Sequence, residues 1–216
     1  MEHHPKKNIT KDTTRIDAFS DGVFGIAITL LVLELIEALH TQTGHGKLLK
    51  VFLDHWQYFV AYTIGFITIL VCWINHHAAF EFINKTDTTL MWINGFLLFV
   101  ITVTPFSTAI LAEYLEKESK TALAIFGFNY FLVSIAADSI CTYAYKKHFI
   151  EEGQREYYVF YKKFYRYAIF YTLVAFLLSF VSAVVPAIMY IVLFVFFSAP
   201  KYFSSKFYKF SLIRKK

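Results

Sequence analysis

The sequence predicts an all-α membrane protein with six transmembrane helices in each subunit. The chain of 216 residues is 57% hydrophobic and has a mean hydropathy of +0.48, whereas soluble domains are about 45 to 50% apolar. A transmembrane helix needs about 20 residues, so the chain accommodates about six spans with short connections. We therefore expect one six-helix domain over residues 1–216, with a polar N-terminal tail at 1–14 and a basic C-terminal tail at 204–216.

The first predicted span covers residues 18–39. The polar start of the chain and the missing A-x-A site argue against a cleaved signal peptide. The span carries three carboxylates, Asp21, Glu34 and Glu37, which a lipid-facing helix would exclude. Ionisable residues within a span usually face a protein interior or a water-filled cavity. We therefore expect this helix to line such an interior.

The second and third spans are predicted at residues 58–82 and 90–111. The second ends in W-I-N-H-H-A-A-F-E-F, which places polar and aromatic side chains near one membrane boundary. The third contains Pro105 after two threonines, whose hydroxyls can satisfy the backbone groups that proline frees.

The fourth predicted span, residues 121–145, includes Asp138 between small and polar neighbours. This carboxylate is interpreted as a hydrogen-bonded packing residue or a subunit contact, with a proton relay as the alternative. Residues 164–203 are almost wholly apolar and twice as long as one span. We therefore divide them into a fifth and a sixth helix near residues 182–186.

The positive charges support six spans with both termini in the cytoplasm. One side receives four Lys or Arg from the N-terminal tail, one from the second connection, five from the fourth and six from the C-terminal tail, whereas the other side receives four. Cytoplasmic loops carry an excess of Lys and Arg. The expected location is therefore the plasma membrane, as a multi-pass protein in contact with the lipid bilayer.

Several functional classes are not favoured by the composition and motifs. The net charge of +5 clusters beside apolar spans without nucleic-acid reading motifs, so no nucleic-acid partner is expected. Cys72 and Cys141 lie in apolar runs and are interpreted as small buried hydrophobes. Adjacent histidines point about 100° apart on a helix and do not chelate one ion as an i,i+4 pair does. The sequence therefore predicts no metal, no cofactor and no enzyme.

The first span has the pattern of a pore wall. At a period of 3.6 residues, one stripe contains Gly22, Ile26, Thr29 or Leu30, Leu33 and Glu37. In the functional interpretation, Ile26, Leu30 and Leu33 narrow an axis and Thr29 offers a hydroxyl. Glu37 then concentrates cations at the outer mouth. The alternative is ordinary packing, since any span shows apolar residues at these spacings.

A polar cluster favours the functional interpretation. Arg15, Ser20 and Asp21 lie at the cytoplasmic end of the first span. If the second span runs antiparallel, Trp73, Asn75, His76 and His77 come to the same end. A buried Asp21 needs hydrogen-bond donors, and indole, imidazole, hydroxyl and guanidinium groups are available. These side chains are therefore expected to tie the first two helices together.

Three segments carry a family likeness. They read R-I-D-A-F-S-D-G-V-F-G-I-A-I-T-L-L-V-L-E-L, W-I-N-H-H and W-I-N-G-F-L-L-F-V-I-T-V-T-P-F. Together they resemble the prokaryotic members of the endolysosomal potassium channel family, transmembrane protein 175. The likeness is close over the first three spans, and the last three match by length and hydropathy. One departure is Gly25, where the family usually has alanine.

The resemblance implies a subunit of six helices whose first helix lines the pore. A single repeat implies a homotetramer. The family's apolar constriction maps onto Ile26, Leu30 and Leu33, and its pore-lining threonine onto Thr29. The family motif itself matches Arg15, Phe19, Ser20 and Asp21, which the family holds through hydrogen bonds to residues such as His77.

The expected function is passive conduction of potassium ions through a homotetrameric pore with a hydrophobic constriction. The first alternative is a proton-coupled cation transporter that uses Asp21, His77 and Asp138. The second is an intramembrane enzyme that uses His76 and His77.

Overall fold

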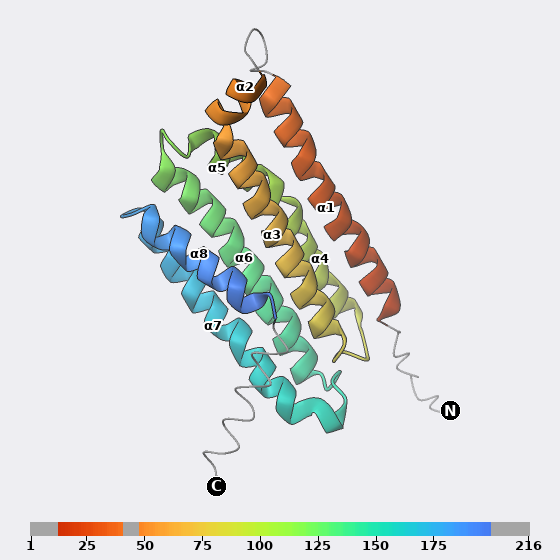
Figure 1. Cartoon of the computed structure of the whole chain (residues 1–216). Coiled ribbons are helices and arrows are strands. Elements are labelled where there is room, and N and C mark those ends of the chain that lie inside the picture. The colour runs from red at the N-terminus through yellow and green to blue at the C-terminus, as the bar shows by residue number, and fades with distance from the viewer. Residues whose placement is uncertain (1–12, 41–47, 200–216) are drawn as a thin grey trace, which may run out of the picture.

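The computed structural model describes residues 13–40 and 48–199, and the chain is helical through almost all of them (Figure 1). The predicted C-terminal tail and residues 1–12 of the predicted N-terminal tail lie outside the described residues. In chain order the elements are α1 (Thr14–His40), α2 (Leu48–Asp54), α3 (Trp56–Phe80), α4 (Thr88–Thr102), α5 (Thr104–Tyr114), α6 (Ser119–Lys146), the 3-10 turn η1 (Glu152–Gln154), α7 (Arg155–Ser179) and α8 (Val184–Phe197).

Four stretches of the described chain are long and apolar enough to cross a membrane. They are the segment Thr14–Glu37 of α1, helix α3, the combined α4 and α5, and helix α6. The prediction of an all-α membrane protein is confirmed. The fifth and sixth predicted spans correspond to α7, which carries several charges, and to α8, which has only 14 residues.

The predicted start of the fifth helix at residue 164 is wrong, because α7 begins at Arg155. Its first turns are amphipathic: Tyr158 and Tyr161 are fully buried, whereas Lys163 is exposed. The hydrophobic run marks only the apolar part of this helix, since a helix can continue in a polar environment when one face stays buried. The predicted break near residues 182–186 is confirmed between Ser179 and Val184.

Pro105 divides the predicted third span into α4 and α5, which meet at Val103. Proline lacks the N–H that would continue the helical ladder. The hydroxyl of Thr104 accepts a hydrogen bond from Asn129 Nδ2 of α6 at 3.0 Å. A buried side chain of a neighbouring helix therefore holds the break in place.

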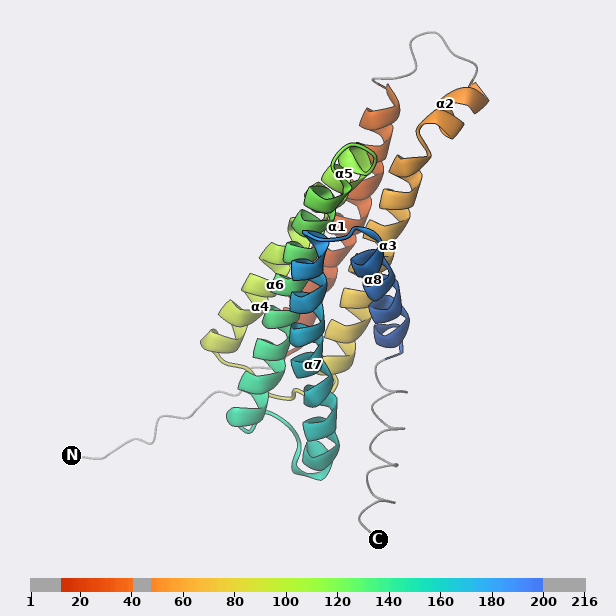
Figure 2. The same ribbon diagram turned by 90° about the vertical axis from the view of Figure 1, so that its left-hand side faces the viewer.

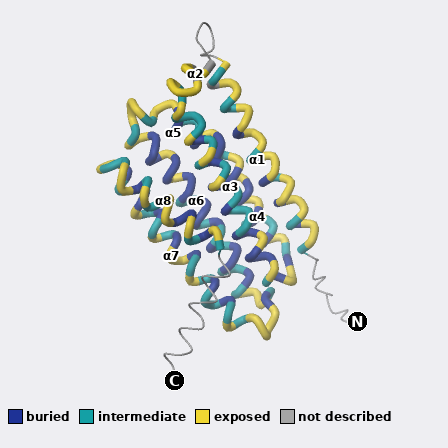
Figure 3. Tube along the Cα trace, viewed as in Figure 1, coloured by how far each residue is buried: buried dark blue, intermediate teal, exposed yellow. Residues whose placement is uncertain are grey.

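The helices form a bundle with α1 at one edge and α7 and α8 at the opposite edge (Figures 1 and 2). Helix α1 packs on α3, α4 and α5, and α6 packs on α4, α5 and α7. Buried positions concentrate on α3, α4 and α6, whereas α1, α7 and α8 carry long exposed stretches (Figure 3). The bundle therefore leaves large apolar faces on its outermost helices.

Two connections are joined at the end of the bundle where α1 begins. Ile83 and Ile150 form an antiparallel bridge, and the backbone N–H of Asn84 donates to the Phe149 carbonyl at 3.0 Å. Asp87 caps α4 by accepting from the backbone N–H of Leu90. The α3–α4 and α6–α7 connections are thereby fixed to each other.

Gly65 allows α3 to lie close to both α1 and α5. A Cβ atom at this position would lie 2.9 Å from Leu31 Cδ2 and 3.0 Å from Thr108 Cγ2. Small residues at helix interfaces in membranes let backbones approach closely. The close approach at Gly65 therefore depends on the missing side chain.

We expect Gly65→Leu to destabilise the protein by about 1–3 kcal/mol, the usual cost of overpacking a filled interior. The measurement is the thermal unfolding midpoint in detergent, with Gly95→Leu as the matched control because the space beside Gly95 is open. Equal midpoints for the two variants would contradict the proposed close packing.

Candidate functional site

Helix α1 has one buried and one exposed face. The buried face contacts the bundle through residues spaced three or four apart, namely Ile16, Ser20, Phe24, Ala27 and Leu31. The opposite face carries large exposed apolar side chains, namely Phe19, Ile26, Leu30, Leu33 and Ile36. Helical geometry separates the centres of these two sets by about a third of a turn. An apolar helix face without a partner among the described residues is therefore continuous along α1.

The residues predicted to narrow a pore all lie on this exposed face. Ile26 is 60% exposed and Leu33 is 58% exposed, with Leu30 between them. The hydroxyl of Thr29 donates to the Ile26 carbonyl at 2.8 Å. Glu37 is also exposed, toward the other end of the helix. The side chains predicted to form the constriction, together with Thr29 and Glu37, are thus all exposed along α1.

A set of hydrogen bonds, here called the clasp, joins α1 to α3 and α4 through Ser20, Asp21, Trp73, His76 and Asn94. Trp73 Nε1 donates to Asp21 Oδ1 at 2.7 Å. Asn94 Nδ2 donates to Ser20 Oγ at 3.0 Å, and Asn94 Oδ1 lies 2.8 Å from His76 Nε2. Ser20, His76 and Asn94 are buried, so these polar atoms depend on one another.

The clasp uses His76, which the sequence interpretation placed at this end of the second span, and Asn94, which that interpretation did not assign to it. His77 is expected to hydrogen-bond the motif on α1, but its described contacts are with Trp73 and Glu81 of its own helix and C-cap. Its ring stacks on Trp73, with ring centroids 5.9 Å apart, and its Nε2 lies 3.6 Å from Glu81 Oε1. Neighbouring residues on a helix point about 100° apart, so His76 faces inward while His77 stays exposed. A polar Asn94 within an apolar span was the available signal.

Arg15 and Phe19, the other two members of the predicted motif, are exposed on α1. Asp21 is exposed as well, although its carboxylate accepts from Trp73. The motif therefore divides into Ser20, which faces the bundle, and three residues that do not.

Asn75, which precedes His76, connects α3 to the other side of the bundle. Its Nδ2 donates to the Val71 carbonyl and to the Phe197 carbonyl, each at 2.7 Å. Tyr165 donates to Asn75 Oδ1 at 3.3 Å. One turn of α3 therefore bonds Asn94 of α4 through His76 and holds α7 and α8 through Asn75.

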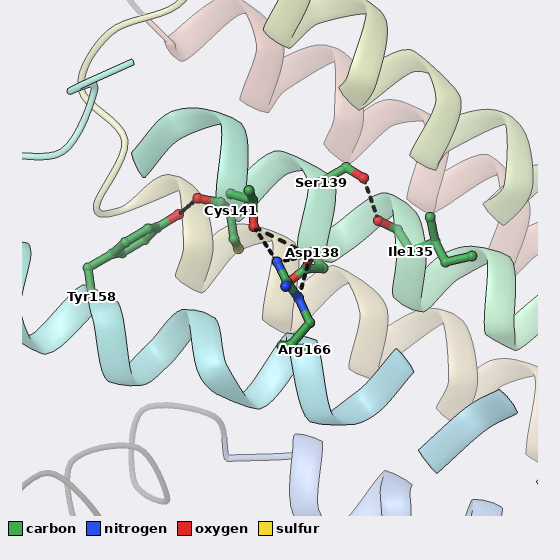
Figure 4. Close-up of polar contacts among 7 residues, drawn as sticks. Ile135, Asp138, Ser139, Cys141, Tyr158 and Arg166 are labelled. Carbon is green, nitrogen blue, oxygen red and sulfur yellow. Dashed lines mark hydrogen bonds and ion pairs between the residues drawn. The ribbon is translucent and has the colours of Figure 1, made fainter. Parts of the chain in front are cut away.

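Asp138 forms an ion pair with Arg166 across α6 and α7 (Figure 4). Arg166 Nε donates to both carboxylate oxygens, and Arg166 Nη2 lies 3.1 Å from Asp138 Oδ2. The packing interpretation of this carboxylate thus has a specific partner. Asp21 and His77 lie at the opposite edge of the bundle, beside α1, so the structure does not bring the three groups of the transporter alternative together.

At the other end of the bundle, α1, α3 and α5 surround a cavity of about 360 Å³. Its lining includes the carboxylates of Glu34, Glu37 and Glu113 and the ring of Tyr58. The predicted mouth residue therefore belongs to a wider acidic region. Among residues 13–40 and 48–199, no group of three or more His, Cys, Asp or Glu side chains is arranged to hold a metal ion.

Fold and site together define a multi-pass helical membrane protein in which one helix presents an unpartnered apolar face between polar ends. The family model described as endosomal/lysosomal potassium channel TMEM175 matches residues 15–105, from α1 to the start of α5. The crystal structure of a lysosomal potassium-selective channel TMEM175 homolog from Chamaesiphon minutus superposes with a TM-score of 0.74 at 35% identity. The match covers 86% of this chain and 96% of that one. The chain belongs to the TMEM175 family, a family of channels rather than enzymes.

Bacterial relatives are similar to this chain over more than half of its length. A potassium channel from Chamaesiphon minutus is 39% identical over 134 residues, or 62% of this chain and 66% of that protein. One from Streptomyces collinus is 36% identical over 125 residues, or 58% and 60%. These alignments span slightly less than two thirds of the relatives. The potassium channel MtTMEM175 shares the fold, with a TM-score of 0.62 at 18% identity over 95% of this chain and 100% of that one.

We expect Asn94→Leu to destabilise the protein more than Trp73→Phe does. The first variant leaves Ser20, which is 0% exposed, and His76 without their shared partner. An unsatisfied buried polar group costs about 1–3 kcal/mol. The second variant removes a bond from Asp21, which remains exposed to solvent. Thermal unfolding of the purified variants measures the difference, and the reverse order would refute the assigned importance of the buried chain.

Proposed function

We propose that the chain is one subunit of a homotetrameric, potassium-permeable channel whose pore is lined by four copies of α1. The observation that carries the proposal is the outward apolar stripe of α1, which continues from Ile26 to Leu33 and has no partner within the described subunit. Family membership supports the proposal, because two bacterial relatives with similar sequences are named potassium channels.

The constriction is formed by Ile26, Leu30 and Leu33, repeated in each subunit. Four branched side chains around a narrow axis exclude water, and a narrow dewetted pore blocks ions until it widens. Such a ring offers no carbonyl oxygens to replace the hydration shell of an ion. The preference for potassium over sodium is therefore modest and follows from the weaker hydration of potassium.

The complete topology has six crossings, with α7 and α8 as the fifth and sixth. Helix α8 is about 21 Å long at 1.5 Å per residue, which is shorter than a hydrocarbon core of about 30 Å. Six crossings place both termini on the cytoplasmic side of the plasma membrane, in agreement with the excess of Lys and Arg there.

We expect Leu30→Ala to raise the potassium current about tenfold, since removing 1.4 kcal/mol from a barrier raises a rate tenfold. The measurement is planar-bilayer recording of purified protein. Ile188→Ala, on the exposed face of α8, is the matched control and keeps the wild-type current. A wild-type protein without cation current, or with equal chloride and potassium permeability, would refute the channel.

We expect Glu37→Gln to lower the potassium current about threefold at roughly 10 mM salt and to leave it unchanged at roughly 1 M salt. The Debye length falls from about 30 Å to about 3 Å between these conditions, which screens the carboxylates at the mouth. The measurement is the ratio of variant to wild-type conductance in the two solutions. A ratio that does not change with salt would contradict an electrostatic role for Glu37.

A further inference from the structure

The exposed face of α7 changes from cationic to apolar along its length. We call this face the α7 stripe and define it as Lys163, Arg166, Tyr167, Phe170, Val174 and Leu177, all of which are exposed. Apart from the adjacent pair Arg166 and Tyr167, successive positions are three or four residues apart, and the set therefore lies on one side of the helix. Two cations and a tyrosine are followed by large apolar side chains.

Arg166 is a preorganised donor at the polar end of the stripe. Its Nε donates to Asp138, and its Nη2 reaches both Asp138 and the hydroxyl of Thr142, at 3.1 and 3.3 Å (Figure 4). None of these contacts uses Nη1, and the side chain is 53% exposed. The guanidinium is thus anchored on one side and retains two N–H groups for another acceptor.

Asp138 explains how a guanidinium is held at this position. The carboxylate side chain is only 9% exposed, so it gains its main compensation for burial from Arg166. The pair is neutral, and Lys163 adds one uncompensated positive charge one turn away, with its Nζ 4.9 Å from the centre of the Phe160 ring. The polar end of the stripe therefore has a net positive charge and fixed hydrogen-bond donors.

The dimensions of the stripe correspond to one leaflet of a bilayer. Arg166 lies 11 residues, or about 16 Å, along α7 from Arg155. The apolar part from Tyr167 to Leu177 extends about 15 Å, which equals half of a hydrocarbon core of about 30 Å. Tyrosine is enriched at the membrane–water interface, so Tyr167 marks the headgroup level.

We propose that the α7 stripe binds one anionic phospholipid. Its phosphate accepts hydrogen bonds from Arg166 Nη1 and from the Tyr167 hydroxyl, and Lys163 supplies attraction for the negative charge. An acyl chain follows Phe170, Val174 and Leu177. Arginine suits this role because its planar fork serves a carboxylate and a phosphate oxygen at the same time. Asp138 acts as a positioning residue for this lipid site.

The first test measures lipid binding to the delipidated full-length protein by native mass spectrometry. The probes are phosphatidylglycerol, which is anionic, and phosphatidylcholine, which is zwitterionic. We expect phosphatidylglycerol to bind about tenfold more tightly, as expected for a charge-assisted contact. Lys163→Gln and Arg166→Lys lower this preference, whereas Lys120→Gln, an exposed charge at the other end of α6, leaves it unchanged.

A double variant serves as the control for misfolding, because Arg166→Gln alone leaves Asp138 buried without a partner. Asp138→Asn combined with Arg166→Gln removes both charges and is expected to fold and to lose the preference about tenfold. Equal binding of the two lipids by the wild type would overturn the proposal. So would an unchanged preference in the double variant, or an equal loss in Lys120→Gln.

The second test locates the lipid. Phe170→Trp is reconstituted with brominated phosphatidylglycerol or brominated phosphatidylcholine, and tryptophan quenching is compared with that of the wild type. We expect additional quenching that is stronger with the anionic lipid. Absence of additional quenching by either lipid would show that a neighbouring subunit covers this face, and would overturn the proposal.

Discussion

The need to pair buried polar groups inside a membrane determines how α1 is oriented. Ser20 is enclosed by the bundle and its hydroxyl accepts from Asn94, which in turn bonds His76. A rotation of α1 by a quarter turn would break the Ser20–Asn94 bond and leave the buried hydroxyl of Ser20 and the Nδ2 group of Asn94 without this partner. The same contact that satisfies Ser20 therefore directs Ile26, Thr29 and Leu33 away from the subunit. The apolar outward face is a consequence of the polar inward one.

Within the clasp, α3 is the element on which the others depend. His76 and Asn75 are neighbours in sequence and point to different sides. His76 bonds Asn94 of α4, which in turn holds Ser20 of α1, whereas Asn75 fastens α7 and α8. The two sides of the bundle differ in character. The α1 side presents an exposed apolar face, whereas the α7 side has an ion pair between the exposed Arg166 and the buried Asp138, followed by a long exposed apolar surface. This division agrees with a pore on the first side and lipid on the second.

The sequence predicted the long apolar helices well, because length and hydropathy are local properties. It also predicted the bond between Asp21 and Trp73, since a charged residue in a span needs a donor and an indole was available. It could not distinguish His76 from His77, because the choice depends on the rotation of α3 against its neighbours. The Asp138–Arg166 pair was missed because the two residues are 28 positions apart and only the packing of α6 on α7 brings them together.

Because the clasp lies near one end of α1, a small tilt of the helix about the clasp displaces the far end of the helix by a larger distance. Leu33 lies 13 residues beyond Ser20, which corresponds to about 20 Å along the axis. Between them the side chain of Leu31 packs closely on Gly65 of α3. A tilt of about 5° at the clasp moves Leu33 by roughly 2 Å. In a four-fold assembly, such a tilt would change the pore diameter at Leu33 by about twice that amount. A small rearrangement of the hydrogen bonds at the clasp would therefore be large enough to decide whether an ion passes.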